Sequence, residues 1–201
     1  MREHWDERYA SPAYVYGTQP NRWLAGKLNG LPAGSILFPA EGEGRNAVYA
    51  ARLGWNVYAF DQSSEGRKKA LKLATEQRVC ISYQLGDLAN HLPSGGPFDV
   101  IALIFVHIHE NQRRQIHRRL ISLLKPDGYL IVEAFTKKQI YNNSGGPKSP
   151  AMLYDREAIR QDFSELDFIE FGEEVVTLNE GPFHRGDANV IRLFARKLKK
   201  H

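Results

Sequence analysis

The sequence has little cysteine, no long apolar run and no internal repeat, and each absence excludes a class of protein. Cys80 is the only cysteine among 201 residues, so no disulfide can form within one chain, as is usual in a reducing compartment. No apolar run approaches the roughly 20 residues that a membrane-spanning helix needs. The N-terminus MREHWDERYASP lacks the apolar core of a signal peptide. We therefore expect a cytoplasmic protein that does not associate with membranes.

Cys80 lies in a short, mainly apolar run, Arg78-Val79-Cys80-Ile81. A free cysteine in such a run behaves as a small hydrophobic residue. The pattern predicts a buried structural thiol rather than a reactive one.

The chain carries a net charge of +4, which by itself suggests a nucleic-acid partner. Much of the excess lies in the tail 196–200 and in residues 113–119. The second segment has the spacing of an amphipathic helix, in which Ile116, Leu120, Leu123 and Leu124 form a buried stripe and the arginines face water. No basic segment is rich in the aromatic side chains that stack on single strands. We therefore expect no nucleic-acid partner.

Strand-like and helix-like segments alternate through the first two thirds of the chain. Because the strand-like segments are apolar on both faces, they predict a parallel sheet that helices cover on both sides. The expected strands are 35–38, 55–60, 79–85, 98–106 and 129–135, and the expected helices are 46–53, 63–77 and the arginine-bearing segment.

The pattern changes after Thr136. Residues 142–150 are rich in turn-forming residues and predict a long loop. Asp155 has the position of an N-cap for a helix over 156–163. Segments 168–178 and 189–198 predict two closing antiparallel strands. The expected fold is α/β: a doubly wound, mostly parallel seven-stranded sheet that ends in an antiparallel hairpin.

A glycine-containing turn follows the first predicted strand, and a helix begins directly after it. Gly42 and Gly44 let the backbone turn sharply and approach a ligand closely. Asp61 ends the second strand, 17 residues beyond Gly44, where its carboxylate can accept hydrogen bonds from both hydroxyls of a ribose. Ligands of such sheets bind outside the carboxyl ends of the strands. Together these features predict a cofactor that contains adenosine.

The third strand ends in Gly86-Asp87, which places a further carboxylate at the same edge. Asp87 either binds an adenine amino group or serves as a turn residue or helix cap, and the sequence leaves both interpretations open. The glycine turn with Asp61 at the end of the second strand fits a nicotinamide cofactor as well as S-adenosylmethionine. A dehydrogenase normally needs a further substrate domain, for which little chain remains, so S-adenosylmethionine is favoured.

These motifs resemble those of the class I methyltransferases over residues 34–136. Residues 41–44 are similar to the glycine-rich first motif of that family, Asp61 to its ribose-binding acid, and residues 124–128 to the turn before its fifth strand. Phe38-Pro39 departs from the family, which more often has an acid and an apolar residue there. The resemblance implies a Rossmann-like methyltransferase fold with S-adenosylmethionine as cofactor. The implied cofactor-binding residues are Tyr16, Ala40, Glu41, Gly42, Gly44, Asn46, Asp61, Gln62, Asp87, Leu88 and Phe105.

Two segments are similar to a narrower group, the tellurite-resistance and thiopurine methyltransferases. These are residues 44–51 and residues 184–189, just before the last strand. The resemblance implies catalytic roles for His184, Arg185 and Arg192. Residues 137–175 differ from this group, so the resemblance does not identify the methyl acceptor.

His184 can take a proton from an acceptor because the ordinary pKa of histidine is about 6.5. Arg185 and Arg192 can hold an anion through paired hydrogen bonds. The alternative is a loop histidine with two surface arginines. His107 follows the fourth strand and lies either near the acceptor or in the packing of a helix start. His107 and His109 lack a clear third ligand, so we expect no metal site.

The segment around Tyr16 resembles the lid region of such enzymes. Tyr16 is expected to touch the cofactor carboxylate, while Trp5 and Tyr9 close the acceptor pocket. The alternative for all three is hydrophobic packing of the cap on the sheet. Lys148 faces either the pocket or water.

The sequence therefore predicts one methyltransferase domain over 1–201. Residues 1–30 form a helical cap or lid, 31–136 the cofactor-binding core, and 137–201 the acceptor-side loop, helix and closing hairpin. We expect a monomer or homodimer that methylates a small molecule: a thiol, a chalcogen oxyanion or another soft nucleophile. Three alternatives remain open: an inactive cofactor-binding protein, a nicotinamide-dependent oxidoreductase, and methylation of RNA or protein.

Overall fold

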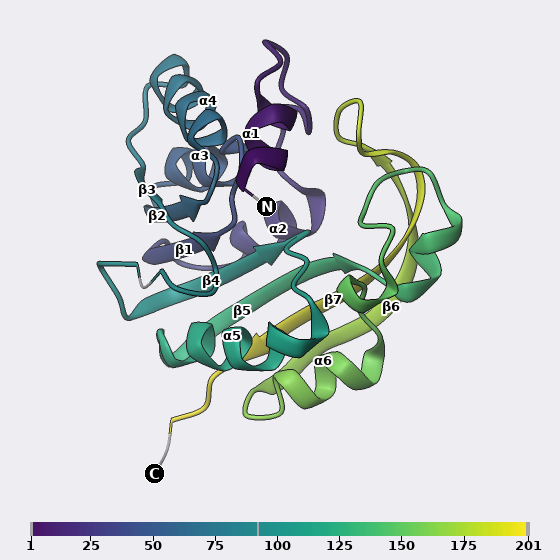
Figure 1. Ribbon diagram of the computed structural model, residues 1–201. Helices are drawn as coiled ribbons and strands as arrows, with labels where there is room; N and C mark the ends of the chain where they lie inside the picture. The colour runs from purple at the N-terminus through teal and green to yellow at the C-terminus, as the bar shows by residue number, and fades with distance from the viewer. Residues whose placement is uncertain (1, 92, 200–201) are drawn as a thin grey trace.

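Seven strands form one sheet in the order β3-β2-β1-β4-β5-β7-β6 (Figure 1). The computed structural model describes residues 2–91 and 93–199. Strands β1 to β5 are parallel, whereas β7 is antiparallel to both β5 and β6. This confirms the predicted fold. The strands are β1 (Ser35–Pro39), β2 (Asn56–Asp61), β3 (Ser82–Leu85), β4 (Phe98–Ile104), β5 (Leu124–Phe135), β6 (Asp167–Asn179) and β7 (Arg185–Arg196).

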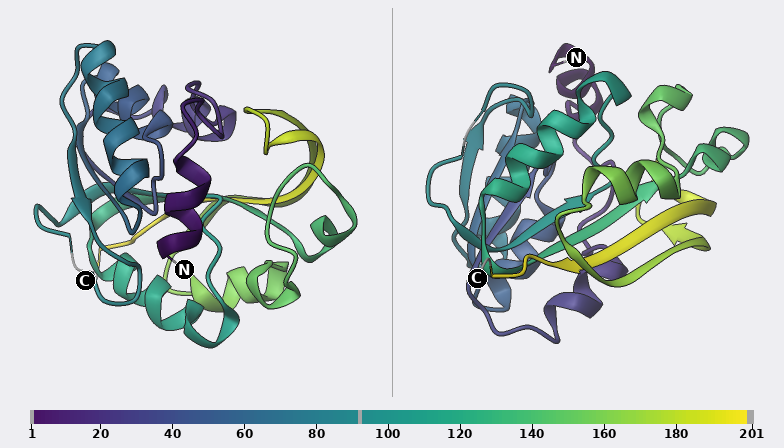
Figure 2. Two further views of the ribbon diagram at one scale, coloured as in Figure 1. Left: turned by 45° about the horizontal axis from the view of Figure 1, so that its top comes forward. Right: turned by 90° about the horizontal axis from the view of Figure 1, so that it is seen from below.

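Helices cover both faces of the sheet. Two short helices, α1 (Arg2–Tyr9) and α2 (Arg22–Leu28), precede it. They are followed by α3 (Arg45–Arg52), α4 (Ser64–Glu76), α5 (Glu110–Ser122) and α6 (Arg156–Asp162), with 3₁₀ turns at Lys137–Tyr141 and Pro150–Met152. Figures 1 and 2 show α5 and α6 together on one face of the sheet. Within the described ranges, none of the helices combines the length and the apolar character needed to cross a bilayer.

The strands bury side chains on both faces because each face has its own core. Ile36 and Phe38 of β1 pack with α2, α3 and α4, whereas Leu37 packs with α5 and α6. The same alternation places Ile131 of β5 in the first core and Val132 in the second. Alternate residues of a strand point to opposite faces, so the unbroken apolar runs of the sequence correspond to a sheet that is covered on both sides.

The third strand begins at Ser82, later than predicted, because α4 ends in a hydrogen-bonded turn. Arg78 has a left-handed φ of 57°. The N–H of Arg78 donates to Thr75 O and that of Val79 to Ala74 O, both at 3.0 Å. This is the Schellman pattern of helix termination. The prediction of a buried Cys80 is wrong: the residue precedes the strand and is exposed.

Two arginines of α5 do not face water as predicted. The Nε of Arg113 lies 2.6 Å from Asp162 of α6, and Arg119 donates to the carbonyls of Leu88 and Ala89. His117, within the same basic run, is 1% exposed. Arg113 and Arg119 of the helix therefore bind neighbouring segments, while Arg114 and Arg118 are exposed.

The hairpin and the loop before it also differ from the expected boundaries. β7 begins at Arg185, four residues earlier than predicted, and pairs with β6 as far as Asn179. Ser144 of the turn-rich loop is buried, and its hydroxyl donates to Asp187 O at 2.6 Å. Asp155 caps α6 as predicted, since its side chain accepts from Ala158 N. Met1, Lys200 and His201, at the ends of the predicted single domain, lie outside the described residues.

Glu43, in the turn before α3, anchors the segment that connects α1 and α2. Its Oε2 accepts from Val15 N at 2.8 Å and from Tyr16 N at 3.3 Å, while its Oε1 lies 2.7 Å from Lys69 Nζ. Only 3% of the Glu43 side chain and 13% of the Lys69 side chain are exposed. Glu43, which a buried ion pair with Lys69 holds in place, therefore fixes the backbone of the N-terminal segment.

Gly44→Ala tests the packing of α3 on α4. A Cβ at Gly44 would lie 2.5 Å from Ala70 Cβ, and φ is 87°. We expect a loss of about 2 to 5 kcal/mol in the free energy of unfolding, from backbone strain and overpacking. Gly54 is the control, because its φ is 86° and no atom lies within 4 Å of its added Cβ. Gly54→Ala should cost only about 1 to 2 kcal/mol in urea unfolding. Equal losses at both positions would contradict this explanation.

Glu43→Ala tests the anchoring of the N-terminal segment. Removing one partner of a buried ion pair costs about 3 to 5 kcal/mol, and here two N–H groups also lose their acceptor. We expect that loss in urea unfolding, together with faster proteolysis between residues 10 and 20. Glu76→Ala removes the exposed partner of Lys72 and should change stability by about 0.5 kcal/mol or less. A Glu43→Ala protein as stable as this control would refute the anchoring role.

Candidate active site

The predicted cofactor residues gather at the carboxyl ends of β1, β2 and β4. The turn 40–44 follows β1, Asp61 ends β2, and Phe105 follows β4. β2 and β4 each pair with β1 in parallel, so their carboxyl ends share one edge. This is the edge at which open parallel sheets bind ligands.

The glycine turn needs its glycines for contacts within the protein. Ala40, Gly42 and Gly44 have positive φ values of 52°, 64° and 87°. A Cβ at Gly42 would lie 2.6 Å from the Tyr9 hydroxyl, and the Tyr83 hydroxyl donates to Gly42 O at 2.6 Å. The absent side chain of Gly42 leaves room for the Tyr9 hydroxyl, a reason that the sequence alone did not reveal.

Glu41 caps the first turn of α3. The N-cap residue is Gly44, which has no side chain to accept a hydrogen bond. Glu41 Oε1 accepts instead from Asn46 N at 2.9 Å and from Ala47 N at 2.8 Å. Burial raises the pKa of Glu41 to about 7, although these hydrogen bonds and the charge of Arg45 lower it. The side chain of Asn46 binds the N-terminal segment, because its Oδ1 accepts from Asn21 N at 2.9 Å.

Asp61 braces the turn from the end of β2. It is 7% exposed, and its two oxygens accept from Gly42 N at 3.0 Å and from Ser63 N at 2.8 Å. Burial raises its pKa to about 6. A carboxylate offers about four lone-pair sites. The two N–H groups therefore leave acceptor capacity for two further donors, as a ribose diol requires.

Asp87 lies at the next strand tip and is exposed. Its Oδ1 accepts from Ala89 N at 2.8 Å and Asn90 N at 2.9 Å. Burial alone would raise its pKa, but the hydrogen bonds from Asn90 and Ala89 hold the pKa below its usual value. Asp87 therefore has the role of a turn residue, which was one of the two interpretations that the sequence left open. Gln62 and Leu88 are half-buried beside Asp61 and Asp87.

The N-terminal segment approaches this edge through Tyr16. Arg8 Nη1 donates to the Tyr16 hydroxyl at 3.1 Å, and the rings of Trp5 and Tyr9 stack with centroids 5.5 Å apart. Asp6 docks α1 on the start of α4, since its Oδ1 accepts from Ser63 Oγ at 2.7 Å. The cap packing expected as the alternative for Tyr9 is therefore observed at a buried position beside the glycine turn.

His184 lies in the hairpin turn before β7 and is 5% exposed. Its ring centroid lies 4.5 Å from that of Tyr16, 4.6 Å from Phe105 and 5.4 Å from Phe135. Its Nδ1 lies 3.3 Å from Glu180 Oε2. The structure thus brings His184 together with two predicted cofactor residues, Tyr16 and Phe105.

The other predicted catalytic residues have separate surroundings. Arg192 is paired with Glu133, which is 1% exposed, and with Glu174 at 2.7 Å. Arg185 is exposed at the start of β7. His107 Nδ1 lies 2.9 Å from Met152 O, and its Nε2 accepts from Phe135 N at 3.4 Å. Both ring nitrogens of His107 are thereby used in packing.

Burial lowers the pKa of His107 to about 4, in spite of its hydrogen bond to Met152. His109 instead caps α5. Lys148 donates to Asn142 O within its own loop at 2.6 Å. In the part of the chain that the structure describes, no group of three histidine, cysteine or acidic side chains is arranged to hold a metal ion.

Sequence reasoning missed Arg45, Glu180 and Gly145. Arg45 Nη2 lies 2.9 Å from Glu180 Oε2, and a Cβ at Gly145 would lie 2.7 Å from His184 Cδ2. Glu180 is four residues before His184, a spacing that could have drawn attention to the pair. Arg45 and Gly145 are distant from His184 in sequence and gave no such signal.

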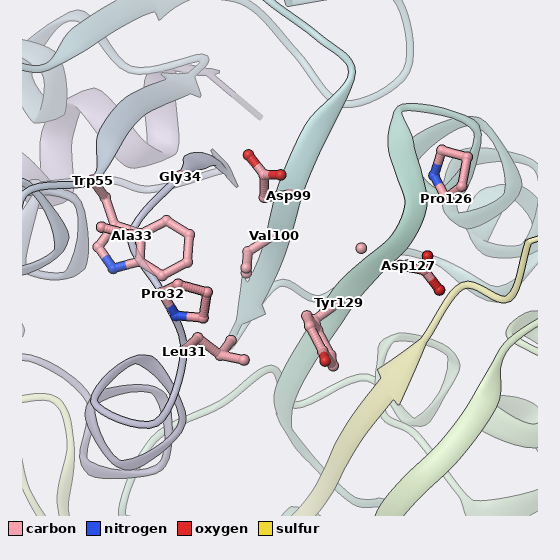
Figure 3. A pocket seen from close by; sticks show the side chains of 11 residues that line it. Leu31, Pro32, Ala33, Gly34, Trp55, Asp99, Val100, Pro126, Asp127 and Tyr129 are labelled. Carbon is pink, nitrogen blue, oxygen red and sulfur yellow. The ribbon is translucent and has the colours of Figure 1, made fainter.

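Two cavities lie outside the cofactor edge. One, of about 250 Å³, lies at the amino ends of β1, β4 and β5, where Trp55, Asp99 and Tyr129 contribute to its lining (Figure 3). Asp99 there is held by Ser35 and Lys125. The other, of about 800 Å³, lies between residues 16–22 and the β6–β7 hairpin, with Glu133 and Arg192 in its wall. It adjoins the site through Tyr16 and Glu180.

Comparison with known proteins agrees with this geometry. Residues 39–132 match a family model described as a methyltransferase domain. The ubiquinone biosynthesis O-methyltransferase of Caulobacter vibrioides is 35% identical over 88 residues, which are 43% of this chain and 35% of that protein. The chain thus spans about a third of the length of the curated relatives that it matches.

Solved structures match over nearly the whole chain. A structure described for the conversion of a disulfide bond into a thioacetal group during echinomycin biosynthesis has a TM-score of 0.80 at 16% identity, and the match covers 98% of this chain and 92% of that one. TehB from Haemophilus influenzae has a TM-score of 0.73 at 17% identity, covering 98% and 66%. Magnesium protoporphyrin IX methyltransferase from Synechocystis, with S-adenosylhomocysteine bound, has a TM-score of 0.65 at 19% identity, covering 98% and 83%. Residues 39–132 are therefore similar to a methyltransferase domain, and the chain as a whole has the Rossmann-like methyltransferase fold of these structures.

Proposed function

We propose that this protein transfers the methyl group of S-adenosylmethionine to a small-molecule acceptor. The observation that carries the proposal is Asp61, a buried carboxylate that braces the glycine turn and retains acceptor capacity for a ribose. The methyltransferase-domain match, which extends from the end of β1 into β5, supports the same function.

The cofactor would lie along the carboxyl ends of β1, β2 and β4. Asp61 would accept the ribose hydroxyls, Asp87 and Leu88 would border the adenine, and the turn 40–44 would face the methionine part. Phe105 and Tyr16, which both contact His184, would border the sulfonium. The sulfonium supplies an already activated methyl group, so the residues of the chain mainly align the reactants and exclude water.

His184 is the proposed catalytic residue, and we place the acceptor beside it. In this proposal residues 1–30 act as the lid and 137–201 as the acceptor side. A thiol, a chalcogen oxyanion or another soft nucleophile remains the proposed acceptor. Arg192 fits a structural role better than anion binding, because two carboxylates already pair with it.

Calorimetric titration with S-adenosylmethionine, with NADH as a comparison, tests the cofactor. We expect the first to bind and NADH not to bind. Asp61→Ala should weaken S-adenosylmethionine binding by about 10- to 100-fold, equivalent to about 1.4 to 2.8 kcal/mol of lost hydrogen bonding. Asp99→Ala removes a carboxylate at the opposite edge (Figure 3) and should leave the affinity unchanged. Binding of NADH alone would support an oxidoreductase instead.

The affinity for S-adenosylmethionine should depend on pH through Asp61. Its pKa in the free protein is raised to about 6 by burial, so lowering the pH below 6 protonates it and removes acceptor capacity. We expect the dissociation constant to rise about tenfold from pH 7 to pH 5, as one pKa unit implies. Asp61→Asn should lack the step near pH 6. An affinity that stays constant across this range in the wild type would show that the carboxylate does not bind the cofactor.

A further inference from the structure

Glu180 is fixed on three sides beside His184. Its Oε2 lies 3.3 Å from His184 Nδ1 and 2.9 Å from Arg45 Nη2, and its Oε1 accepts from Asn21 Nδ2 at 3.3 Å. The side chains of Arg45 and Glu180 are 8% and 12% exposed. Burial alone would raise the pKa of Glu180, but the hydrogen bond from His184 and the charge of Arg45 hold it below its usual value. Glu180 is therefore an ionised acceptor.

An ionised carboxylate can only accept hydrogen bonds, so His184 Nδ1 must carry the hydrogen of this contact. The neutral ring then has its lone pair on Nε2. Within residues 2–91 and 93–199, the hydrogen bond of the His184 side chain is made by Nδ1, and Nε2 makes none. A Cβ at Gly145 would lie 3.2 Å from this atom, so the glycine leaves its edge of the ring free of a side chain.

Burial is the main reason that the ring of His184 stays neutral. Burial lowers its pKa, as do the charges of Arg45 from α3 and Arg8 from α1, whereas Glu180 raises it. Tyr16 faces the ring from the N-terminal segment.

Two of the cations around His184, Arg45 and Arg8, are already engaged. Arg45 pairs with Glu180. Arg8 donates to Tyr16 and lies over the Phe183 ring, with its Cζ 4.9 Å from the centroid. The surroundings of His184 are otherwise aromatic, since Tyr16, Phe105 and Phe135 line it. Such a site favours an uncharged acceptor with an apolar body.

We infer that Glu180 is a positioning residue that holds His184 as a general base, and that the acceptor is a neutral protic group of the thiol or phenol class. The acceptor part of this inference rests on the proposed methyl transfer. In the reaction the acceptor X–H bond breaks and His184 Nε2 takes the proton. The electron pair left on X forms the new bond to the methyl carbon as the C–S bond of the sulfonium breaks, and the pair of that bond passes to sulfur. Glu180 stabilises the imidazolium that results.

This inference separates two kinds of acceptor. A chalcogen oxyanion attacks through the lone pair of its chalcogen atom, which carries no proton, so this attack needs no base. A thiol or phenol gains from a base that lies within hydrogen-bond reach.

Nitrogen NMR of the cofactor-free protein with ¹⁵N-labelled histidine tests the positioning role. We expect His184 in wild type to show the Nδ1–H tautomer, with an unprotonated Nε2 at pH 7.5. Glu180→Gln should lower the pKa of His184 by about one unit, because the adjacent negative charge is removed. Glu174→Gln is the matched control: it removes a carboxylate of β6 that pairs with Arg192, and it should leave the pKa of His184 unchanged.

An Nε2–H tautomer in wild type, or an unchanged pKa in Glu180→Gln, would overturn the positioning role. The wild-type tautomer decides the question even if the variant does not fold. This spectrum is independent of S-adenosylmethionine binding. A correct tautomer without cofactor binding would refute the proposed function alone, whereas cofactor binding with the wrong tautomer would refute this inference alone.

The acceptor class is tested with benzyl mercaptan, 4-methylphenol and sodium tellurite as probes, because the first two keep their protons at pH 7.5. Each is incubated with S-adenosylmethionine and wild-type protein, and methylated products are measured by mass spectrometry. We expect a methylated thiol or phenol and a kcat about tenfold or more lower in Glu180→Gln, within the range that general-base catalysis contributes. Methylation of tellurite alone, or of neither protic probe, would contradict the assignment of the acceptor class.

Discussion

Glu41, Glu43 and Asp61 surround the turn between β1 and α3 and accept hydrogen bonds from backbone N–H groups on both sides of it. Gly44 has a left-handed backbone and no side chain, so α3 cannot be capped in the usual way. Glu41 supplies the missing acceptor from within the turn, and Asp61 at the end of β2 accepts from Gly42 N. Buried polar groups need such partners, because an unpaired one costs about 1 to 3 kcal/mol. The shape of the proposed cofactor edge follows from this arrangement.

Residues of this turn and of the start of α3 also bind segments near both ends of the chain. Glu43 holds the backbone of residues 15 and 16, and Asn46 holds that of Asn21. Arg45 reaches Glu180, which contacts His184. Buried ion pairs contribute less to stability than their number suggests, but they can select one arrangement among several. Here they connect the N-terminal segment, α3 and the closing hairpin around the cluster of aromatic rings at His184.

Much of the fold could be predicted because its signals are local. Apolar strand-like segments that alternate with helix-like segments predicted the sheet. Asp155 was recognised as a helix cap from its position alone. The start of β3 was wrong because Arg78, rather than a glycine, adopts the left-handed conformation that ends α4. Cys80 was placed in the core for the same reason. The two arginines of α5 were placed in water because their partners, Asp162 and the carbonyls after β3, lie far away in sequence.

The site was only partly predictable, for a related reason. Gly42, Gly44 and Asp61 were recognised from spacing along the chain, and their geometry agrees with a cofactor edge. His184 contacts the rings of Tyr16, Phe105 and Phe135, which lie in separate segments, and no spacing along the chain reveals those contacts. Arg192 was singled out from its place in a motif, but its pairing with Glu133 depends on the register of β5 and β7.

The most direct test of a cofactor at this edge is a crystal structure of the protein with S-adenosylhomocysteine. We predict both ribose hydroxyls within hydrogen-bond distance of Asp61, the adenine beside Asp87 and Leu88, and the sulfur facing the ring of His184. Electron density for the ligand elsewhere, such as in the cavity at the amino ends of β1, β4 and β5, would contradict that placement.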